Sequence, residues 1–285
     1  MGVFLGAALL APWLYRACQA LAPHSTFCHD MALKPFHRYV TRIAMVVAIL
    51  GLYPWLKASG VKSPASIGLT SPWGRAGEVW GGIGLGFLSL ASVAGLSLLL
   101  GARAVNEQMT VGVLWHLSLT ALLTAIVIAA CEEVLFRGVL FTRLKPEMGV
   151  FGALVMSSAV YSIVHFFART PDPQVVTWSS GLTVLRAMLG DFINPHALFP
   201  GFITLFFVGA ILAALTQRTG SLYAPMGLHA GWVFWMKMYG AVTHARAGAS
   251  SVLWGDTKLY DGWVSLGVVL LCGVVVARRG SRPRS

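Results

Sequence analysis

Eight long apolar runs constrain this chain more than any other feature of its sequence. A helix needs roughly 17–25 mostly apolar residues to cross the hydrocarbon core of a bilayer. The first run contains Arg16 and the last is short, but all eight approach this length. We therefore expect an all-α fold, a polytopic membrane helix bundle with about eight transmembrane helices. The runs are Val3–Ala22, Val40–Gly60, Trp80–Leu100, Met109–Leu140, Val150–Ala168, Leu198–Thr216, Ser221–Gly240 and Gly262–Ala277.

The composition agrees with a chain surrounded by lipid. Only 11% of the residues are charged, whereas a soluble domain carries about a quarter. The net charge of +11 comes from basic residues that stand singly between apolar runs, so we expect no nucleic-acid partner. The four cysteines are far apart and form no CxxC pair, which predicts neither a disulfide framework nor a zinc ribbon.

The runs suggest three parts and an orientation. We expect three N-terminal spans in residues 1–108, a core in 109–240, and a loop, a final transmembrane helix and a basic tail in 241–285. Eight spans place both termini on one side, and the arginines of the tail favour the cytoplasm. The chain is thus predicted to be an integral protein of the plasma membrane, the inner membrane in a bacterial cell. The long link Arg169–Pro200 has room for a short amphipathic or re-entrant segment.

Three ionisable residues interrupt the end of the fourth apolar run. Each costs about 2.5–3.5 kcal/mol or more near the bilayer centre, so such residues predict a functional site. Glu133 and Arg137 are four residues apart and can form an ion pair on one helix face. Glu132 lies about 100° around the helix and has no obvious partner there, so it is a candidate general acid or base. The alternative is a polar cluster that only fixes helix packing.

Two histidines stand in later apolar runs. His165 ends the fifth run and His229 lies midway along the seventh. A single histidine in an apolar helix is usually a hydrogen-bonded core residue. Together with the glutamate pair, however, these two predict side chains that converge from three helices on a shared wet cavity. A carboxylate and one imidazole would activate a water molecule, and the second imidazole would donate to a developing oxyanion.

The ordered motifs resemble the CPBP family of intramembrane proteases, which includes CAAX proteases and bacteriocin-processing proteins. The resemblance covers about Leu114 to Trp235. Its first motif, EExxxR, matches Glu132, Glu133 and Arg137, and its second, FxxxH, matches His165 with a tyrosine in place of phenylalanine. The third motif fits a Phe-xx-Gly and a later glycine, and the fourth begins at His229. The remaining matched positions are Tyr161, Phe206, Gly209 and Gly220.

The resemblance implies a role for each site residue. Glu132 and His165 would activate the water, Glu133 and Arg137 would order the site, and His229 would stabilise the oxyanion. The family has an asparagine or aspartate four residues after the last histidine, but this chain has Val233 there. Valine cannot donate a hydrogen bond, and losing one such donor typically costs about 10²–10³ in rate. A nearby group would have to substitute, and the candidates are Trp232, Trp235 and Tyr223.

The sequence therefore predicts an endopeptidase that hydrolyses a membrane-associated or lipid-modified peptide with activated water. One alternative is a catalytically weak or inactive member that serves as a membrane binding or scaffold protein. A second is a proton-coupled transporter that uses Glu132 and the histidines as a relay. We expect no cofactor; if a metal is bound, zinc on Glu132, His165 and His229 is the alternative. The GGIGLGF run at Gly81–Phe87 predicts close helix packing.

Overall fold

The computed structural model is almost entirely helical over the residues it describes, which are 2–58, 60–61, 63–107, 109–166, 173, 175–190, 199–255 and 259–279. The predicted helical class agrees with it, apart from one short strand pair. The chain divides into two compact units. Residues 1–60 and 164–198 form the first unit, and residues 61–163 and 199–285 form the second. The predicted division at residues 108 and 240 stays a prediction.

The first unit contains the N-terminal helices. Tyr15 packs its ring edge-on against Phe36 and Tyr39, with centroids 5.6 and 5.2 Å away, and this joins the first and third helices. Arg16, which interrupts the first apolar run, donates to the carbonyl oxygen of Val176 (3.3 Å). The helices are α1 (Gly2–Leu21), α2 (Thr26–Ala32), α3 (Phe36–Ala58) and α7 (Ser180–Gly190).

The last helix of this unit falls within the link where a short segment was expected. It covers Ser180–Gly190. The rest of that link lies largely outside the described residues, as do residues 280–285 of the basic tail.

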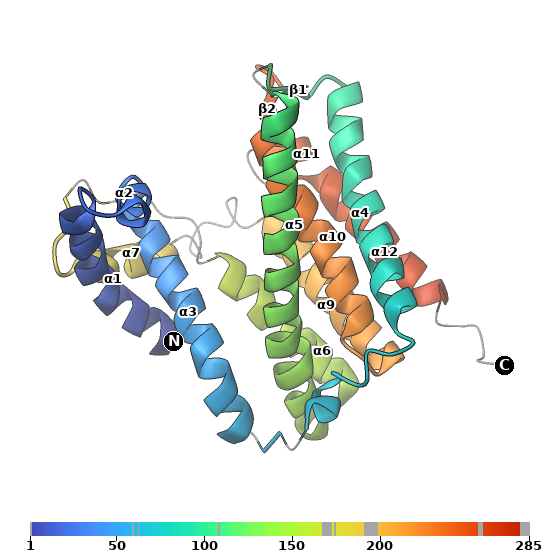
Figure 1. Ribbon diagram of the computed structural model, residues 1–285. Helices are drawn as coiled ribbons and strands as arrows, with labels where there is room; N and C mark the ends of the chain where they lie inside the picture. The colour runs from blue at the N-terminus through green and yellow to red at the C-terminus, as the bar shows by residue number, and fades with distance from the viewer. Residues whose placement is uncertain are drawn as a thin grey trace. The chain divides into compact units, whose positions relative to one another are not determined.

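The second unit contains most of the other helices (Figure 1). α10 lies between α4 and α5, and it contacts both along much of its length (Figure 1). The elements are η1 (Pro64–Ile67), α4 (Ala76–Leu99), β1 (Arg103–Val105), α5 (Val111–Glu133), η2 (Val134–Phe141), α6 (Thr142–Phe166), α9 (Gly201–Thr219), α10 (Tyr223–Val242), β2 (Thr243–Ala245), α11 (Ser251–Trp254) and α12 (Trp263–Arg279). Of α6, the residues from Val164 on belong to the first unit.

Three helical stretches of the described chain are long and apolar enough to cross a membrane. They are Ala76–Leu99, Val111–His165 with its internal breaks, and Gly201–Thr219. The apolar helix at Trp263–Arg278 is shorter. These stretches are consistent with a membrane helix bundle, and the count of eight spans stays a prediction.

The turn between the fourth and fifth predicted spans differs from expectation. The predicted spans Met109–Leu140 and Val150–Ala168 leave residues 141–149 between them, but the chain continues from α5 through the π-helix η2 into α6 and leaves helical geometry at Gly149. Gly149 has φ 69° and ψ 174°, a conformation that only glycine adopts readily. The break is therefore one residue, and the segment before it is helical.

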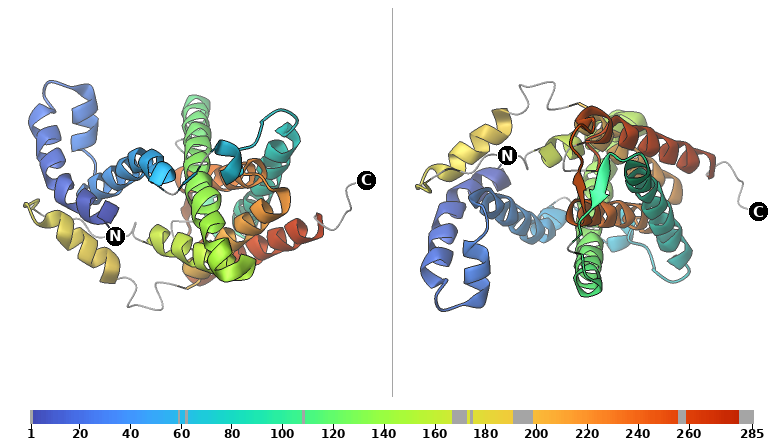
Figure 2. Two further views of the ribbon diagram at one scale, coloured as in Figure 1. Left: turned by 90° about the horizontal axis from the view of Figure 1, so that it is seen from below. Right: turned by 90° about the horizontal axis from the view of Figure 1, so that it is seen from above.

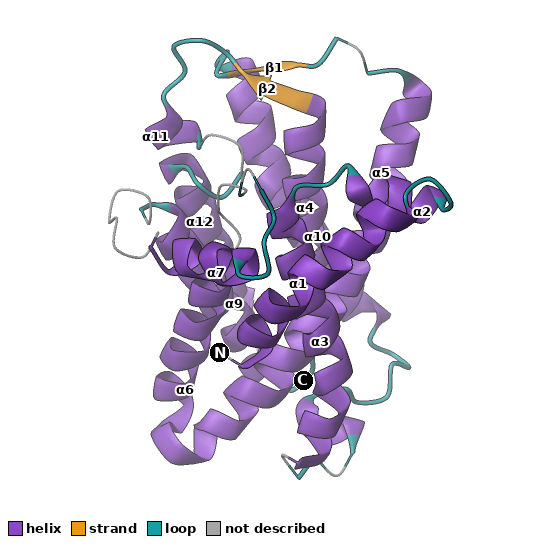
Figure 3. Ribbon diagram, turned by 90° about the vertical axis from the view of Figure 1, so that its left-hand side faces the viewer, coloured by secondary structure: helices purple, strands orange, loops and turns teal. Residues whose placement is uncertain are grey.

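A short antiparallel ribbon joins the end of α4 to the end of α10 (Figure 2, right; Figure 3). Arg103 pairs with Ala245 in the register. The buried Arg103 guanidinium donates to the hydroxyl and the carbonyl oxygen of Thr243 and lies 4.4 Å from the ring centroid of Tyr239. These contacts fasten the α4–α5 connection to the C-terminal end of α10.

Glycines allow α4 and α10 to cross at backbone contact. A Cβ on Gly231 would lie 2.6 Å from the backbone nitrogen of Phe87, and one on Gly86 would collide with the carbonyl oxygen of Leu228. Gly82 and Gly86 repeat at a four-residue interval on α4, as Gly227 and Gly231 do on α10. Such pairs let membrane helices approach closely. The prediction of close packing for the glycine run is confirmed.

We expect Gly86→Ala to destabilise the second unit, because its methyl group has no room at the crossing and overpacking costs about 1–3 kcal/mol. Gly84→Ala is the matched control, since a Cβ at Gly84 of the same helix meets no atom within 4 Å. Thermal unfolding in detergent micelles measures both. Equal unfolding temperatures for the two variants would contradict the close crossing.

Candidate active site

Four buried polar side chains meet in the second unit, where the end of α5 faces α10. Glu133 is the last residue of α5, and Arg137 lies in η2. His229 comes from the middle of α10 and Tyr161 from α6. All four are at most 2% exposed. Residues distant in sequence thus share one polar cluster inside an apolar bundle.

Glu133 connects the cluster through a single oxygen atom. Its Oε1 accepts from Nη1 of Arg137 at 2.9 Å and lies 2.8 Å from Nδ1 of His229. The ion pair expected from the four-residue spacing is present. The contact with His229 could not be read from that spacing, and it makes Glu133 the residue that orients the imidazole.

Arg137 is held by partners on three other elements. Its Nη2 donates to the carbonyl oxygen of Gly209 at 3.3 Å, and its guanidinium carbon lies 4.5 Å from the ring centroid of Tyr161. A Cβ on Gly209 would come within 2.9 Å of the Cα of Ser158, so glycine lets α9 pack tightly on α6. Gly209, the glycine of the third motif, therefore supplies a backbone carbonyl oxygen that accepts from Arg137.

The π-helix also serves Arg137. The hydroxyl of Thr142 donates to the carbonyl oxygen of Arg137, five residues earlier, at 3.0 Å. π-Helical turns are rare and frequently occur at functional sites. Here the side chain of Thr142, the first residue after η2, satisfies the backbone acceptor of Arg137.

His229 presents its second nitrogen to Glu132. The distance from Nε2 to Oε2 of Glu132 is 3.7 Å, and the Glu132 side chain is 25% exposed. Because Glu133 occupies Nδ1, it determines which tautomer the neutral ring adopts and how the ring is turned. The structure thus places the more accessible carboxylate beside the Nε2 edge of an oriented imidazole.

His165 lies one helical turn beyond Tyr161 on α6, and its side chain is partly exposed. It belongs to the first unit, so its participation in the site stays a prediction. Among the described residues, no three His, Cys, Asp or Glu side chains are grouped so that they could hold a metal ion. The zinc alternative gains no support from this donor set.

Val233 lies one turn after His229 and is a core residue. It packs with Ala125 and Ala129 of α5 and with Ala230. This alanine face of α5 is what lets the helix lie close to α10. The side chain at this position therefore contributes packing and no hydrogen bond.

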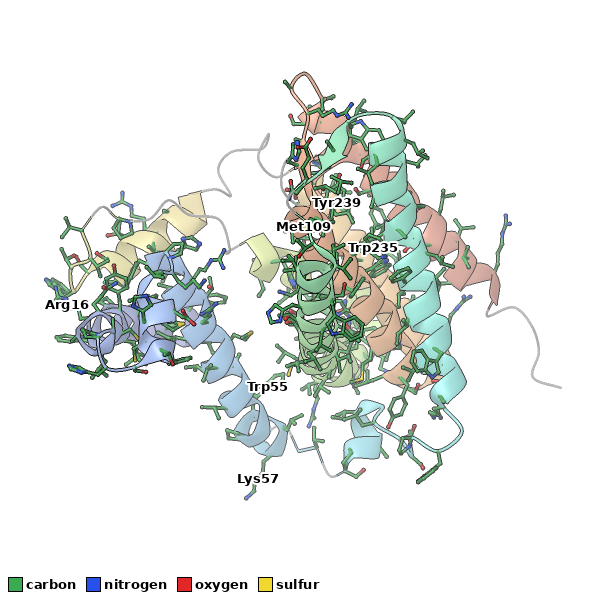
Figure 4. The ribbon with its side chains drawn as sticks, turned by 45° about the horizontal axis from the view of Figure 1, so that its top comes forward. Arg16, Trp55, Lys57, Met109, Trp235 and Tyr239 are labelled. Atoms are coloured by element: carbon green, nitrogen blue, oxygen red, sulfur yellow. The ribbon has the colours of Figure 1, made fainter. Side chains whose placement is uncertain are left out.

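Two of the three candidate substitutes for the missing amide, Trp232 and Tyr223, donate to other acceptors, and Trp235 stays a prediction. The indole N–H of Trp232 donates to the hydroxyl of Ser89 (2.9 Å), and the Tyr223 hydroxyl donates to the Thr70 carbonyl (2.8 Å). Trp235 packs against Phe87 of α4, with ring centroids 5.1 Å apart (Figure 4). These side chains serve the contacts of α10 with α4 and with the segment before α4.

Tyr161 is the site residue whose role the sequence reasoning missed. Its hydroxyl oxygen lies 3.3 Å from Nε2 of His229, and its ring packs edge-on against Phe136 at 5.1 Å. The available signal was the tyrosine in place of the phenylalanine of the second motif. That departure adds a hydroxyl group to the cluster.

Breaking the buried ion pair should be far more costly than breaking an exposed one. The pairs Glu133–Arg137 (2.9 Å) and Glu78–Arg75 (2.7 Å) have similar lengths, but their side chains are 0–2% and 25–28% exposed. We expect Arg137→Met to lower the free energy of unfolding by about 3–5 kcal/mol and Arg75→Met by less than about 1 kcal/mol. Denaturant titration in detergent measures the difference, and similar losses would contradict the buried pair.

The family comparison agrees with the motifs. A family model described as "Type II CAAX prenyl endopeptidase Rce1-like" matches residues 114–235. No curated protein and no solved structure matches the chain. The matched segment contains Glu132, Glu133, Arg137, His165 and His229, and the family implies a protease. Residues 114–235 of this chain therefore match the Rce1-like type II CAAX prenyl endopeptidases, the CPBP family that the ordered motifs predicted.

Proposed function

We propose that this protein is an intramembrane endopeptidase that uses activated water to hydrolyse a peptide bond of a membrane-associated or lipid-modified peptide. The observation that carries the proposal is the chain of contacts from Arg137 through Glu133 to His229, which leaves the imidazole facing Glu132. A general base beside an oriented imidazole is the arrangement that water-mediated acyl cleavage needs.

The reaction begins at Glu132. Its carboxylate takes a proton from a water molecule, and the water oxygen bonds to the carbonyl carbon of the substrate. The carbonyl oxygen becomes an oxyanion that accepts a hydrogen bond from Nε2–H of doubly protonated His229. Glu132 then gives its proton to the amide nitrogen, the carbon–nitrogen bond breaks, and a carboxylic acid and an amine leave.

The charges of the cluster suit this step. Two carboxylates and one guanidinium sum to one negative charge, so protonated His229 brings the group to neutrality. Buried charges are tolerated when they are paired and hydrogen-bonded. In the proposal Glu133 and Arg137 hold His229 in place, and His165 assists Glu132 in positioning the water.

We also propose the location and partners that the sequence predicted. The protein would lie in the plasma membrane with both termini in the cytoplasm, and its partners would be lipid and a membrane peptide. The support is the apolar helices together with Arg278 and Arg279, which follow the last apolar stretch as the positive-inside rule expects.

Glu132→Gln should abolish cleavage while leaving the fold intact, because the amide cannot accept the proton of water. Glu147→Gln, at an exposed position of α6, is the matched control and should retain cleavage. Peptide termini in membranes from cells that express each form, identified by mass spectrometry, provide the readout. Termini that need the wild-type protein should be missing only with Glu132→Gln.

The same comparison tests the two alternatives. If Glu132→Gln produces the same termini as the wild-type protein, Glu132 is not the base and the proposed function fails. A scaffold protein would retain its biological activity in that variant. Proton-coupled uptake by proteoliposomes would favour the transporter.

A further inference from the structure

We propose that the Tyr161 hydroxyl is a catalytic hydrogen-bond donor to the oxyanion. It supplies the hydrogen bond that the valine at position 233 cannot donate. The inference rests on the proposed function and assigns a further catalytic residue to that site. It starts from two departures of the chain from the motifs it otherwise follows. Tyrosine at 161 adds a hydroxyl group, and valine at 233 removes a donor.

The Tyr161 hydroxyl and Nε2 of His229 lie at a distance that one oxygen atom can bridge. The Tyr161 oxygen and Nε2 of His229 are 3.3 Å apart, and an oxygen about 2.8–3.0 Å from each completes a nearly equilateral triangle. A single carbonyl oxygen can therefore accept from both atoms at once. Nε2 is also the atom that faces Glu132, so the base lies beside the donors.

Packing around the Tyr161 ring holds its hydroxyl group in place. The Tyr161 ring contacts the guanidinium of Arg137, 4.5 Å from its centroid, and packs edge-on against the ring of Phe136. Its side chain is 2% exposed. A donor fixed in a water-excluded site needs no reorganisation when charge develops, which makes it effective in catalysis.

The side chain at position 233 contributes to helix packing instead of hydrogen bonding. Val233 fills the seam between α5 and α10 together with Ala125 and Ala129. The seam gains apolar packing, while the donor comes from Tyr161 of α6. The two departures therefore compensate each other.

Tyr161→Phe tests the assignment, and the chain offers a closely matched control. Tyr239 is also a buried tyrosine, its ring also lies under an arginine (Arg103, 4.4 Å), and its hydroxyl also bonds to a neighbour (Ser97, 3.2 Å). It belongs to the end of α10 near the ribbon (Figure 4). We expect Tyr161→Phe to lower kcat by about 10²–10³ with KM little changed, and Tyr239→Phe to leave kcat unchanged.

The assay uses a synthetic peptide that spans one terminus found only with the wild-type protein, reconstituted in bicelles. Rescue separates a catalytic from a structural role. In Tyr161→Phe/Val233→Asn the new amide stands one turn from His229, and kcat should recover by about tenfold or more. A Tyr161→Phe variant that cleaves as fast as Tyr239→Phe would overturn the assignment. The assignment would also be overturned if Tyr161→Phe is unstable and the added Val233→Asn change does not restore its kcat.

Failure of the proposed function has a different signature. If Glu132→Gln leaves the rate unchanged, the water-activation mechanism itself is wrong. If Glu132→Gln is inactive but Tyr161→Phe is fully active, the mechanism stands and only the role of Tyr161 falls.

Discussion

The buried carboxylate of Glu133 is the interaction on which the rest of the site depends. An isolated carboxylate in such an apolar setting would be prohibitively costly, and it is tolerated only when it is paired and hydrogen-bonded. Arg137 supplies the charge and His229 a second contact to the same oxygen. The arginine in turn requires an acceptor, which the backbone of Gly209 provides. One buried charge thus ties α5, η2, α9 and α10 together.

Helix packing places this cluster. His229 lies between Gly227 and Gly231, the glycines that bring α10 into backbone contact with α4. On the opposite side, the alanine face of α5 packs on Ala230 and Val233. Small residues on both sides therefore fix the axial position and the rotation of α10. These two quantities determine the direction of the His229 imidazole. Because lipid gives membrane helices no hydrophobic reason to associate, such close packing is a main source of their specificity.

Much of this could be predicted from local patterns. Apolar runs indicated the helices, four-residue spacing indicated the Glu133–Arg137 pair, and glycine spacing indicated close packing. What could not be predicted depends on contacts between distant segments. Nothing local to Glu133 indicates that its oxygen meets His229, 96 residues later. The π-helix, the helical continuation to Gly149 and the ribbon are likewise outcomes of tertiary packing.

The errors have the same origin. Trp232 and Tyr223 were chosen because they are near Val233 in sequence, but helix rotation directs their donors to Ser89 and to the segment before α4. Tyr161 was noted only as a mismatch, since its distance from His229 in sequence hides the 3.3 Å contact. Residue type singled out Glu133, Arg137 and His229, and their three-dimensional placement shows which atoms they contact.

The central claim is that Glu133 accepts a hydrogen bond from Nδ1–H of His229. Nitrogen-15 NMR of histidine-labelled protein in detergent micelles tests it most directly, with the His229 signal assigned by its loss in His229→Asn. The account predicts a protonated, strongly hydrogen-bonded Nδ1 in the wild-type protein whose resonance changes in Glu133→Gln and is unaffected in Glu147→Gln. The claim would be contradicted if Nδ1 of His229 carries no proton. It would also be contradicted if the Nδ1 resonance is the same in Glu133→Gln as in the wild-type protein.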